Sequence, residues 1–129
     1  MPNSVLIVDD EPRITAALLV RLQSRGYVVF HAINGLAGVE AAMMHEPDVI
    51  VMDVRMPDID GFEACARIKQ MPVFRNTPVL FLSANSQEGF RQRAVEAGAS
   101  MFLSKPYDAA DVMSGIECLI AQNPGAKER

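Results

Sequence analysis

Hydrophobic residues along this chain gather in five short runs that are separated by polar and turn-forming segments. Short runs of valine, isoleucine and leucine that are not interrupted by polar residues are typical of strands that are buried on both faces of a parallel sheet. The pattern predicts five core strands, at residues 5–8, 27–30, 49–53, 79–82 and 100–103.

Between these runs, apolar residues recur every three or four positions, which indicates amphipathic helices. Five helices are expected, at about 12–25, 36–46, 62–71, 86–97 and 108–122. For the second helix, the spacing predicts a turn at Asn34-Gly35 and a core-facing stripe of Leu36, Val39 and Met43. Gly26 and Gly98 are expected to end the first and fourth helices, and Asp108 to cap the fifth.

Strands that alternate with helices through short connections predict right-handed crossovers and one all-parallel sheet. Because such a sheet carries helices on both faces, the expected fold class is α/β, a doubly wound three-layer sandwich. With 129 residues, half of them hydrophobic, the chain can bury one core and form one domain.

Composition narrows the classes of function. A formal net charge of −4 argues against direct nucleic-acid binding by this domain. The longest apolar run falls far short of the roughly 20 residues that span a membrane, and the first residues lack the pattern of a signal peptide. We therefore expect a cytoplasmic protein without membrane association. Cys65 and Cys118 lack metal-type spacing and are expected to be reduced core residues.

Polar side chains stand where four of the predicted strands end: Asp9 and Asp10, then Asp53, Ser83 and Lys105. The carboxyl ends of parallel strands meet at one edge of a sheet, so these side chains can converge. Three neighbouring carboxylates would each have a raised pKa unless a cation neutralised them. Carboxylate oxygens favour Mg²⁺, which is often shared with a phosphate. A lysine and a hydroxyl suit phosphoryl oxygens, and an Asp can be the nucleophile that forms an acyl phosphate.

Each of these residues alone has a simpler interpretation. Asp9 or Asp10 could cap the helix that follows, and Asp53 could cap the turn after its strand. Lys105 alone would be a solvated lysine, and Ser83 a hydroxyl at a strand end. The common position of all five at strand ends favours a site.

The motifs at these strand ends resemble those of the receiver domain of two-component response regulators. They are Val-Asp-Asp-Glu-Pro at 8–12, Met-Asp-Val-Arg-Met-Pro-Asp-x-Asp-Gly at 52–61, Leu-Ser-Ala at 82–84 and Lys-Pro at 105–106. The resemblance covers residues 4 to about 121, both to the stand-alone chemotaxis regulator and to N-terminal receivers of larger regulators. It implies a flavodoxin-like sheet in the order 2-1-3-4-5 and a receiver domain at 4–122, with 123–129 as a tail or the start of a linker.

The resemblance also implies roles for the site residues. Asp53 would be the phosphoacceptor, and Lys105 would pair with the phosphoryl group. Asp10, Asp53 and the backbone carbonyl of Arg55 would bind Mg²⁺ directly, with Mn²⁺ as an alternative, and Asp9 would act through bound water.

The switch of such a domain would use Ser83, which hydrogen-bonds the phosphoryl group, and Phe102, which turns inward when Ser83 moves. Ser83 stands where many members have Thr, and Phe102 where many have Tyr, so the ring lacks a hydroxyl. Arg55 and Asn85 hold the positions with which the family tunes the lifetime of its acyl phosphate.

The implied function is a phosphoacceptor switch of a two-component phosphorelay rather than a turnover enzyme. A histidine kinase or phosphotransfer protein would phosphorylate it. The surface of the fourth helix, fifth strand and fifth helix would then control an output domain or partner protein, or form a homodimer.

Two alternatives remain. A phosphate-independent interaction module on this fold would normally have lost one of the site residues, and this chain has them all. A phosphatase of haloacid-dehalogenase type needs an Asp-x-Asp pair, and Glu11 stands where its second Asp should be.

Overall fold

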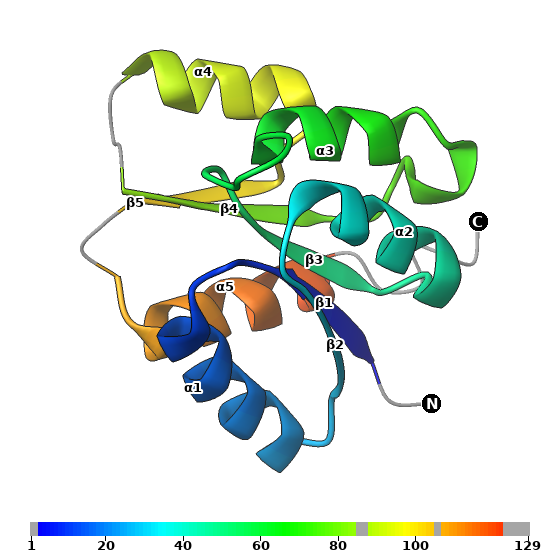
Figure 1. Ribbon diagram of the computed structural model, residues 1–129. Coiled ribbons are helices and arrows are strands. Elements are labelled where there is room, and N and C mark those ends of the chain that lie inside the picture. Colours follow the sequence, from blue (N-terminus) through cyan, green and yellow to red (C-terminus); the bar gives the residue numbers. More distant parts are fainter. Residues whose placement is uncertain (1–2, 85–87, 105–106, 123–129) are drawn as a thin grey trace.

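The computed structural model describes residues 3–84, 88–104 and 107–122, whose arrangement is drawn in Figure 1. The strands are β1 (Ser4–Val8), β2 (Val28–Ala32), β3 (Val49–Asp53), β4 (Val79–Ser83) and β5 (Met101–Ser104). The helices are α1 (Pro12–Ser24), α2 (Gly35–His45), α3 (Gly61–Lys69), α4 (Glu88–Ala97) and α5 (Ala109–Gln122), with the 3₁₀ turn η1 (Pro72–Phe74) after α3.

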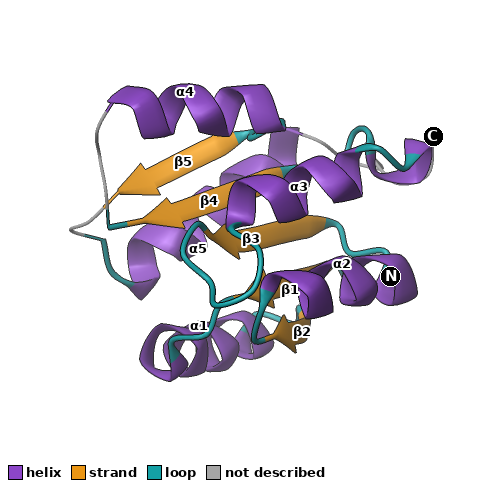
Figure 2. Ribbon diagram, turned by 45° about the horizontal axis from the view of Figure 1, so that its top comes forward, coloured by secondary structure: helices purple, strands orange, loops and turns teal. Residues whose placement is uncertain are grey.

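The five strands form one parallel sheet in the order β2-β1-β3-β4-β5. Helices α1 and α5 cover one face of the sheet, and α2, α3 and α4 cover the other (Figures 1 and 2). The order reverses at β1, and in open α/β sheets ligands bind in the crevice beyond the strand ends at such a point. The predicted three-layer sandwich is confirmed, together with its strand order.

Alternate strand residues face two hydrophobic cores, one under each helical layer. All residues of β1 and β4 are buried. Beneath α2, α3 and α4 lie Leu6, Val8, Ile50, Met52 and Phe81. Beneath α1 and α5 lie Val5, Ile7, Val51, Leu80 and Leu82. Because the central strands are buried on both faces, their sequences are continuous apolar runs rather than alternations.

Three predicted helix-end signals are confirmed, at α1, α4 and α5, whereas the predicted turn signal at α2 has a different role. Gly26 and Gly98, just beyond α1 and α4, have φ of +87° and +101°, a conformation that glycine adopts without strain. Asp108 and Asp111 cap the start of α5, since each side chain accepts a hydrogen bond from the other's backbone N–H, at 3.0 and 2.9 Å. Asn34 was expected in a turn but is the N-cap of α2, where it accepts a hydrogen bond from the backbone N–H three residues on.

The predicted inner stripe of α2 is wrong at Leu36 and Met43, whereas Val39 is confirmed as packed against the core. Leu36 and Met43 are 47% and 56% exposed, and Val39 is only partly buried. The buried residues of α2 are Gly35, Gly38 and Ala42. A Cβ added to Gly38 would lie 2.8 Å from Cγ1 of Val8, so α2 packs too close to β1 for a larger side chain there. Close backbone packing selects small residues for the inner face and leaves the larger ones outside.

Two expectations from composition have different outcomes. Cys65 is buried, but Cys118 is exposed on α5, so the prediction that both cysteines lie in the core is wrong for Cys118. Within the part of the chain that the structure describes, each helix is too short or too polar to cross a bilayer.

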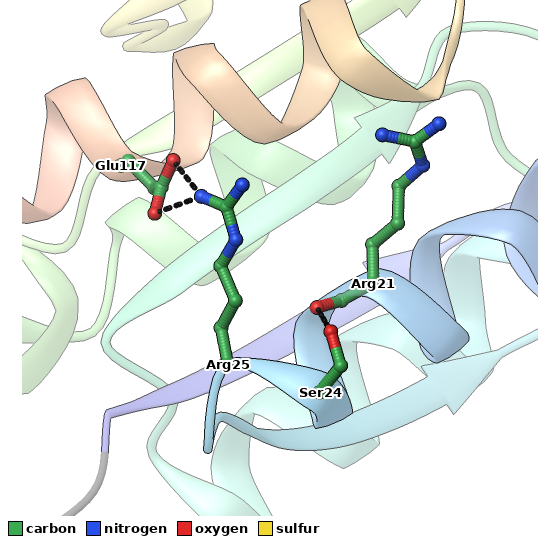
Figure 3. Close-up of polar contacts among 4 residues, drawn as sticks. All are labelled: Arg21, Ser24, Arg25 and Glu117. Atoms are coloured by element: carbon green, nitrogen blue, oxygen red, sulfur yellow. Dashed lines mark hydrogen bonds and ion pairs between the residues drawn. The ribbon is translucent and has the colours of Figure 1, made fainter.

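The end of α1 is tied to α5 on the surface of the molecule. One guanidinium nitrogen of Arg25 lies 2.6 and 2.7 Å from the two carboxylate oxygens of Glu117 (Figure 3). In the same turn, the Ser24 hydroxyl donates to the backbone carbonyl of Arg21 at 2.8 Å. Both charged side chains of the ion pair are well exposed, and such surface pairs contribute about 1 kcal/mol or less. The two buried cores therefore supply most of the stability.

Candidate functional site

Three carboxylates meet at the carboxyl ends of the neighbouring strands β1 and β3. Asp53 is the last residue of β3, and Asp9 and Asp10 directly follow β1. Carboxylate oxygens from all three lie within 4.8 Å of one another. Asp9 is buried, Asp53 is half-buried and Asp10 is exposed, so the cluster opens to solvent on one side. The predicted convergence of these three residues is confirmed.

The backbone around Asp9 is held from three directions. Its N–H donates to the carbonyl of Ala32 at the end of β2, at 3.0 Å. Its side chain accepts a hydrogen bond from the backbone N–H of Glu11 at 2.7 Å. The Nε2 atom of His31 lies 2.9 Å from the carbonyl oxygen of Asp9, and since a carbonyl only accepts, Nε2 is the donor. This contact of His31 could not be predicted, because the sequence of a strand does not indicate the direction of an exposed side chain.

The electrostatics of the cluster oppose its ionisation. Burial, and then the negative charge of Asp9, raise the pKa of Asp53 to about 7. Burial also raises the pKa of Asp9, although its carboxylate accepts a backbone hydrogen bond. A cation among these oxygens would reverse both effects, because an opposite charge within a few ångströms favours the ionised carboxylate. An all-oxygen donor set of this kind fits a small hard cation such as Mg²⁺.

The loop after Asp53 turns sharply back against the strand. The N–H of Val54 donates to Leu82 of β4 at 3.0 Å, and the carbonyl of Val54 accepts from Gly61 at 2.8 Å. The backbone N–H of Arg55 donates to Oδ1 of Asp53 at 3.2 Å, while the Arg55 side chain is exposed. A Cβ added to Gly61 would lie 2.3 Å from the carbonyl oxygen of Asp53, so only glycine fits where α3 begins. Backbone contacts thus orient the carboxylate of Asp53.

Two further predicted residues lie on the strands beyond β3. Ser83 ends β4 and is buried, on the same edge of the sheet as the acidic cluster. Phe102 of β5 pairs with Phe81 of β4 and packs partly against the core under α2, α3 and α4. The guanidinium carbon of Arg91 on α4 lies 5.3 Å from the centre of the Phe102 ring, within range of a cation–π contact. The ring of Phe102, at the predicted switch position, is therefore in contact with a side chain of α4.

The remaining predicted residues, Lys105 and Asn85, lie outside the described residues. Tyr107 follows Lys105 closely and is described. Burial, and then the charges of Asp53 and Asp9, raise the pKa of its phenol to about 12. The phenol of Tyr107 therefore lies within electrostatic reach of the acidic cluster. Tyr107 was not predicted as a site residue, since a lone tyrosine between a proline and a helix carries no signal of that kind.

The chain is similar to known proteins in sequence and in fold. A family model described as "Response regulator receiver domain" matches residues 5–117. Among curated relatives, the chain is 32% identical over 120 residues to the DNA-binding dual master transcriptional regulator RpaA of Synechocystis, covering 93% of this chain and 49% of that protein. It is 37% identical over 123 residues to the transcriptional regulatory protein PdtaR of Mycobacterium tuberculosis, covering 95% and 58%. The chain thus spans about half the length of the curated relatives it matches.

Solved structures with the same fold include receiver domains. The chemotaxis response regulator CheY4 of Vibrio cholerae superposes with a TM-score of 0.86 at 28% identity, over 92% of this chain and 99% of that one. The receiver domain of a Pseudomonas aeruginosa sensor histidine kinase superposes with a TM-score of 0.83 at 30% identity, over 94% and 99%. That domain is described with a magnesium ion coordinated in its active-site cleft.

Proposed function

The chain belongs to the response regulator receiver domain family, and from that premise we propose that it is a phosphoacceptor switch of a two-component phosphorelay. The family consists of signalling modules rather than turnover enzymes. The observation that carries the proposal is the cluster of Asp9, Asp10 and Asp53, with oxygens within 4.8 Å of one another at the strand ends.

Asp53 is the proposed phosphoacceptor. A carboxylate oxygen of Asp53 attacks the phosphorus atom of a phosphohistidine, and the phosphorus–nitrogen bond breaks. The electron pair of that bond stays on the imidazole nitrogen, which takes up a proton, and Asp53 becomes an acyl phosphate. Support comes from its place at the end of β3, where the N–H of Arg55 holds one oxygen at 3.2 Å.

The proposed metal ligands are Asp10, Asp53 and the backbone carbonyl of Arg55, with Asp9 acting through a bound water. Bound Mg²⁺, or Mn²⁺ in its place, would offset the charge of the carboxylates and of the phosphoryl oxygens. The exposed Asp10 and buried Asp9 support this division of roles, since Asp10 faces the open side of the cluster. The magnesium ion in the related Pseudomonas domain supports the choice of metal.

Three further residues are proposed to respond to the phosphoryl group. Lys105 would pair with one of its oxygens, and the Ser83 hydroxyl would donate to another. The approach of Ser83 would draw Phe102 inward, and because this ring lacks a hydroxyl, its burial and its contact with Arg91 at 5.3 Å would report the change. Arg55 and Asn85 would tune the lifetime of the acyl phosphate.

The proposed partners are a histidine kinase or phosphotransfer protein upstream, and an output domain or partner protein downstream. The surface of α4, β5 and α5 would carry the signal, either to that partner or to a second copy of the chain. A groove on this surface lies between β5 and α5. The side chains of Met101, Leu103 and Tyr107 form an apolar part of its lining. Because Tyr107 lines this groove and also lies within electrostatic reach of Asp53, it supports a link between the site and this surface.

The test is the intact mass of the protein after incubation with acetyl phosphate and Mg²⁺, with an EDTA control. A gain of one phosphoryl group that needs the metal and decays afterwards is expected for the wild type. Asp53→Asn should abolish the gain and leave the protein folded. Asp48→Asn is the matched control, because Asp48 binds the backbone of Ser4 at the other end of β1, and it should be labelled normally. Labelling of Asp53→Asn would refute the assignment.

A further inference from the structure

The loop that follows the proposed phosphoacceptor, residues 54–60, is attached to the start of α2. The two carboxylate oxygens of Asp58 accept hydrogen bonds from consecutive backbone N–H groups of that helix. Oδ1 lies 2.9 Å from the nitrogen of Gly35, and Oδ2 lies 2.8 Å from the nitrogen of Leu36. We call this pair of hydrogen bonds the Asp58 clamp.

The clamp joins two surfaces that are in close contact. A Cβ added to Gly35 would lie 2.5 Å from Cγ1 of Ile59 and 2.8 Å from its carbonyl oxygen, so the loop rests directly on the first residue of α2. The next backbone N–H along the helix is that of Ala37, and it donates to the side-chain oxygen of Asn34, the N-cap residue of α2, at 2.8 Å. Because Asn34 already caps α2, the helix has its own start signal, and the clamp adds an attachment from a distant loop.

The same loop is attached at its other end. The side chain of Asp60 caps α3 by accepting from the N–H of Glu63 at 2.9 Å, and its second oxygen lies 3.4 Å from Arg93 of α4. Just after the end of β3, the backbone of Val54 is hydrogen-bonded both to Leu82 of β4 and to Gly61. Between these attachments lies Arg55, whose N–H holds Oδ1 of Asp53. The Asp58 clamp is the hydrogen-bonded attachment of the outer part of the loop to α2, and it stands beside the packing of Ile59 on Gly35.

We propose that Asp58 is a positioning residue for the phosphoacceptor: by clamping the loop to α2, it sets where the backbone of Arg55 stands relative to Asp53. This inference rests on the proposed function, in which that backbone also supplies a metal ligand. If the loop is already held in one place, the N–H and carbonyl of Arg55 need not be ordered when a metal binds or a phosphoryl group is transferred. The entropy cost of ordering them is then avoided. Loss of the clamp should therefore lower the affinity for Mg²⁺ and slow the labelling of Asp53.

The experiment compares Asp58→Ala with Asp48→Ala, measuring the urea midpoint, the dissociation constant for Mg²⁺ by calorimetry and the rate of labelling by acetyl phosphate. Asp48 is the matched control because it too accepts hydrogen bonds from a distant segment, the N–H and hydroxyl of Ser4 at 2.7 and 3.4 Å, at the edge of the sheet away from the site. Both variants should lose stability. Only Asp58→Ala should weaken Mg²⁺ binding, by about tenfold, the lower end of the effect of groups that support metal ligands.

Asp58→Asn separates position from charge, and it is the variant to use if Asp58→Ala does not fold. It keeps one oxygen that can accept from Gly35 or Leu36 but turns an N–H₂ toward the other donor. Its Mg²⁺ affinity should fall between those of the wild type and Asp58→Ala. An unchanged Mg²⁺ affinity in the Asp58 variants, with the same loss of stability as Asp48→Ala, would overturn the inference and leave Asp58 as a helix cap only. Failure of the wild type to be labelled would instead refute the proposed function, since the Mg²⁺ measurement does not depend on labelling.

Discussion

Replacing Gly61 by Ala should disturb the proposed phosphoacceptor through the backbone. The new Cβ would lie 2.3 Å from the carbonyl oxygen of Asp53 and 3.0 Å from Cα of Val54, whereas real Cβ contacts stay beyond 3.0 Å. In an interior packed as densely as a crystal, the strand end or the helix start must then move by roughly 0.7 Å or more. Overpacking costs typically 1–3 kcal/mol. Because the nearest obstructing atom is the backbone oxygen of Asp53 and only Met52 contributes a side-chain atom, at 3.0 Å, we expect about 3 kcal/mol.

Urea unfolding followed by far-ultraviolet circular dichroism measures this cost. At a slope of about 2 kcal/mol per molar urea, the midpoint of Gly61→Ala should fall by about 1.5 M. The matched control is Gly89→Ala, near the start of α4, where an added Cβ meets nothing within 4 Å. That variant should be more stable by about 0.5 kcal/mol, because alanine favours the helix. A Gly61→Ala midpoint equal to that of the wild type would show that the turn after Asp53 is not packed as described.

Two further predictions concern ionised groups. The pKa of Asp53 is about 7 in the folded protein, against an ordinary value of 3.8. Without metal, the folded state therefore binds more protons than the unfolded state at pH values between these two. Because stability then decreases as the pH rises, the melting temperature in EDTA should fall from pH 4 to pH 7. Mg²⁺ should restore stability most at pH 8, and Asp53→Asn should flatten the profile; a decline of the same size in that variant would assign it to other groups. Lys69 donates to three backbone carbonyls after α3, the first being that of Phe74 at 3.2 Å. Lys69→Met should therefore lower the free energy of unfolding by about 2 kcal/mol, whereas Arg67→Met, which loses an exposed ion pair, should change it by less than about 0.5 kcal/mol. Equal urea midpoints for these two variants would contradict the role of Lys69.

The sheet could be predicted because burial on both faces leaves a direct record in the sequence. Residues 5–8, 49–52 and 79–82 are unbroken apolar runs, and they form the three central strands. The predicted second strand, at 27–30, lies at 28–32. This strand is at the edge of the sheet, and Ala32 alone among its five residues is buried, so its apolar signal is weaker and its limits less certain.

The inner face of α2 could not be predicted from hydrophobicity, because the helix approaches β1 too closely. Where backbones are in near contact, the buried residues are those with the smallest side chains, here Gly38 and Ala42. Leu36 and Met43 have the larger hydrophobic signal, and they lie outside. A hydrophobicity pattern identifies the inner face only when large side chains fill the space between the elements.

In the candidate site, too, some features could be predicted from the sequence and others depend on packing. Asp9, Asp10 and Asp53 could be placed together because a general rule puts the carboxyl ends of parallel strands at one edge of the sheet. The groups that hold this cluster follow no such rule. His31 reaches the carbonyl of Asp9 from a neighbouring strand, and Asp58 reaches α2 from a loop. Their directions depend on the packed structure, which the spacing of residues does not encode.

The dependence of the acidic cluster on the residues around it has a physical consequence for the proposed switch. The cluster itself is unfavourable, since burial and the charge of Asp9 raise the pKa of Asp53 to about 7. Such a site is kept together only if its surroundings resist the repulsion of its members, because otherwise the carboxylates would move apart toward water. The backbone bonds of the loop and the Asp58 clamp supply that resistance. In the proposed function, neutralisation by a metal and the arrival of a phosphoryl group would change the charge at a fixed place. We therefore expect the response to be taken up by elements that can move, rather than by the carboxylates.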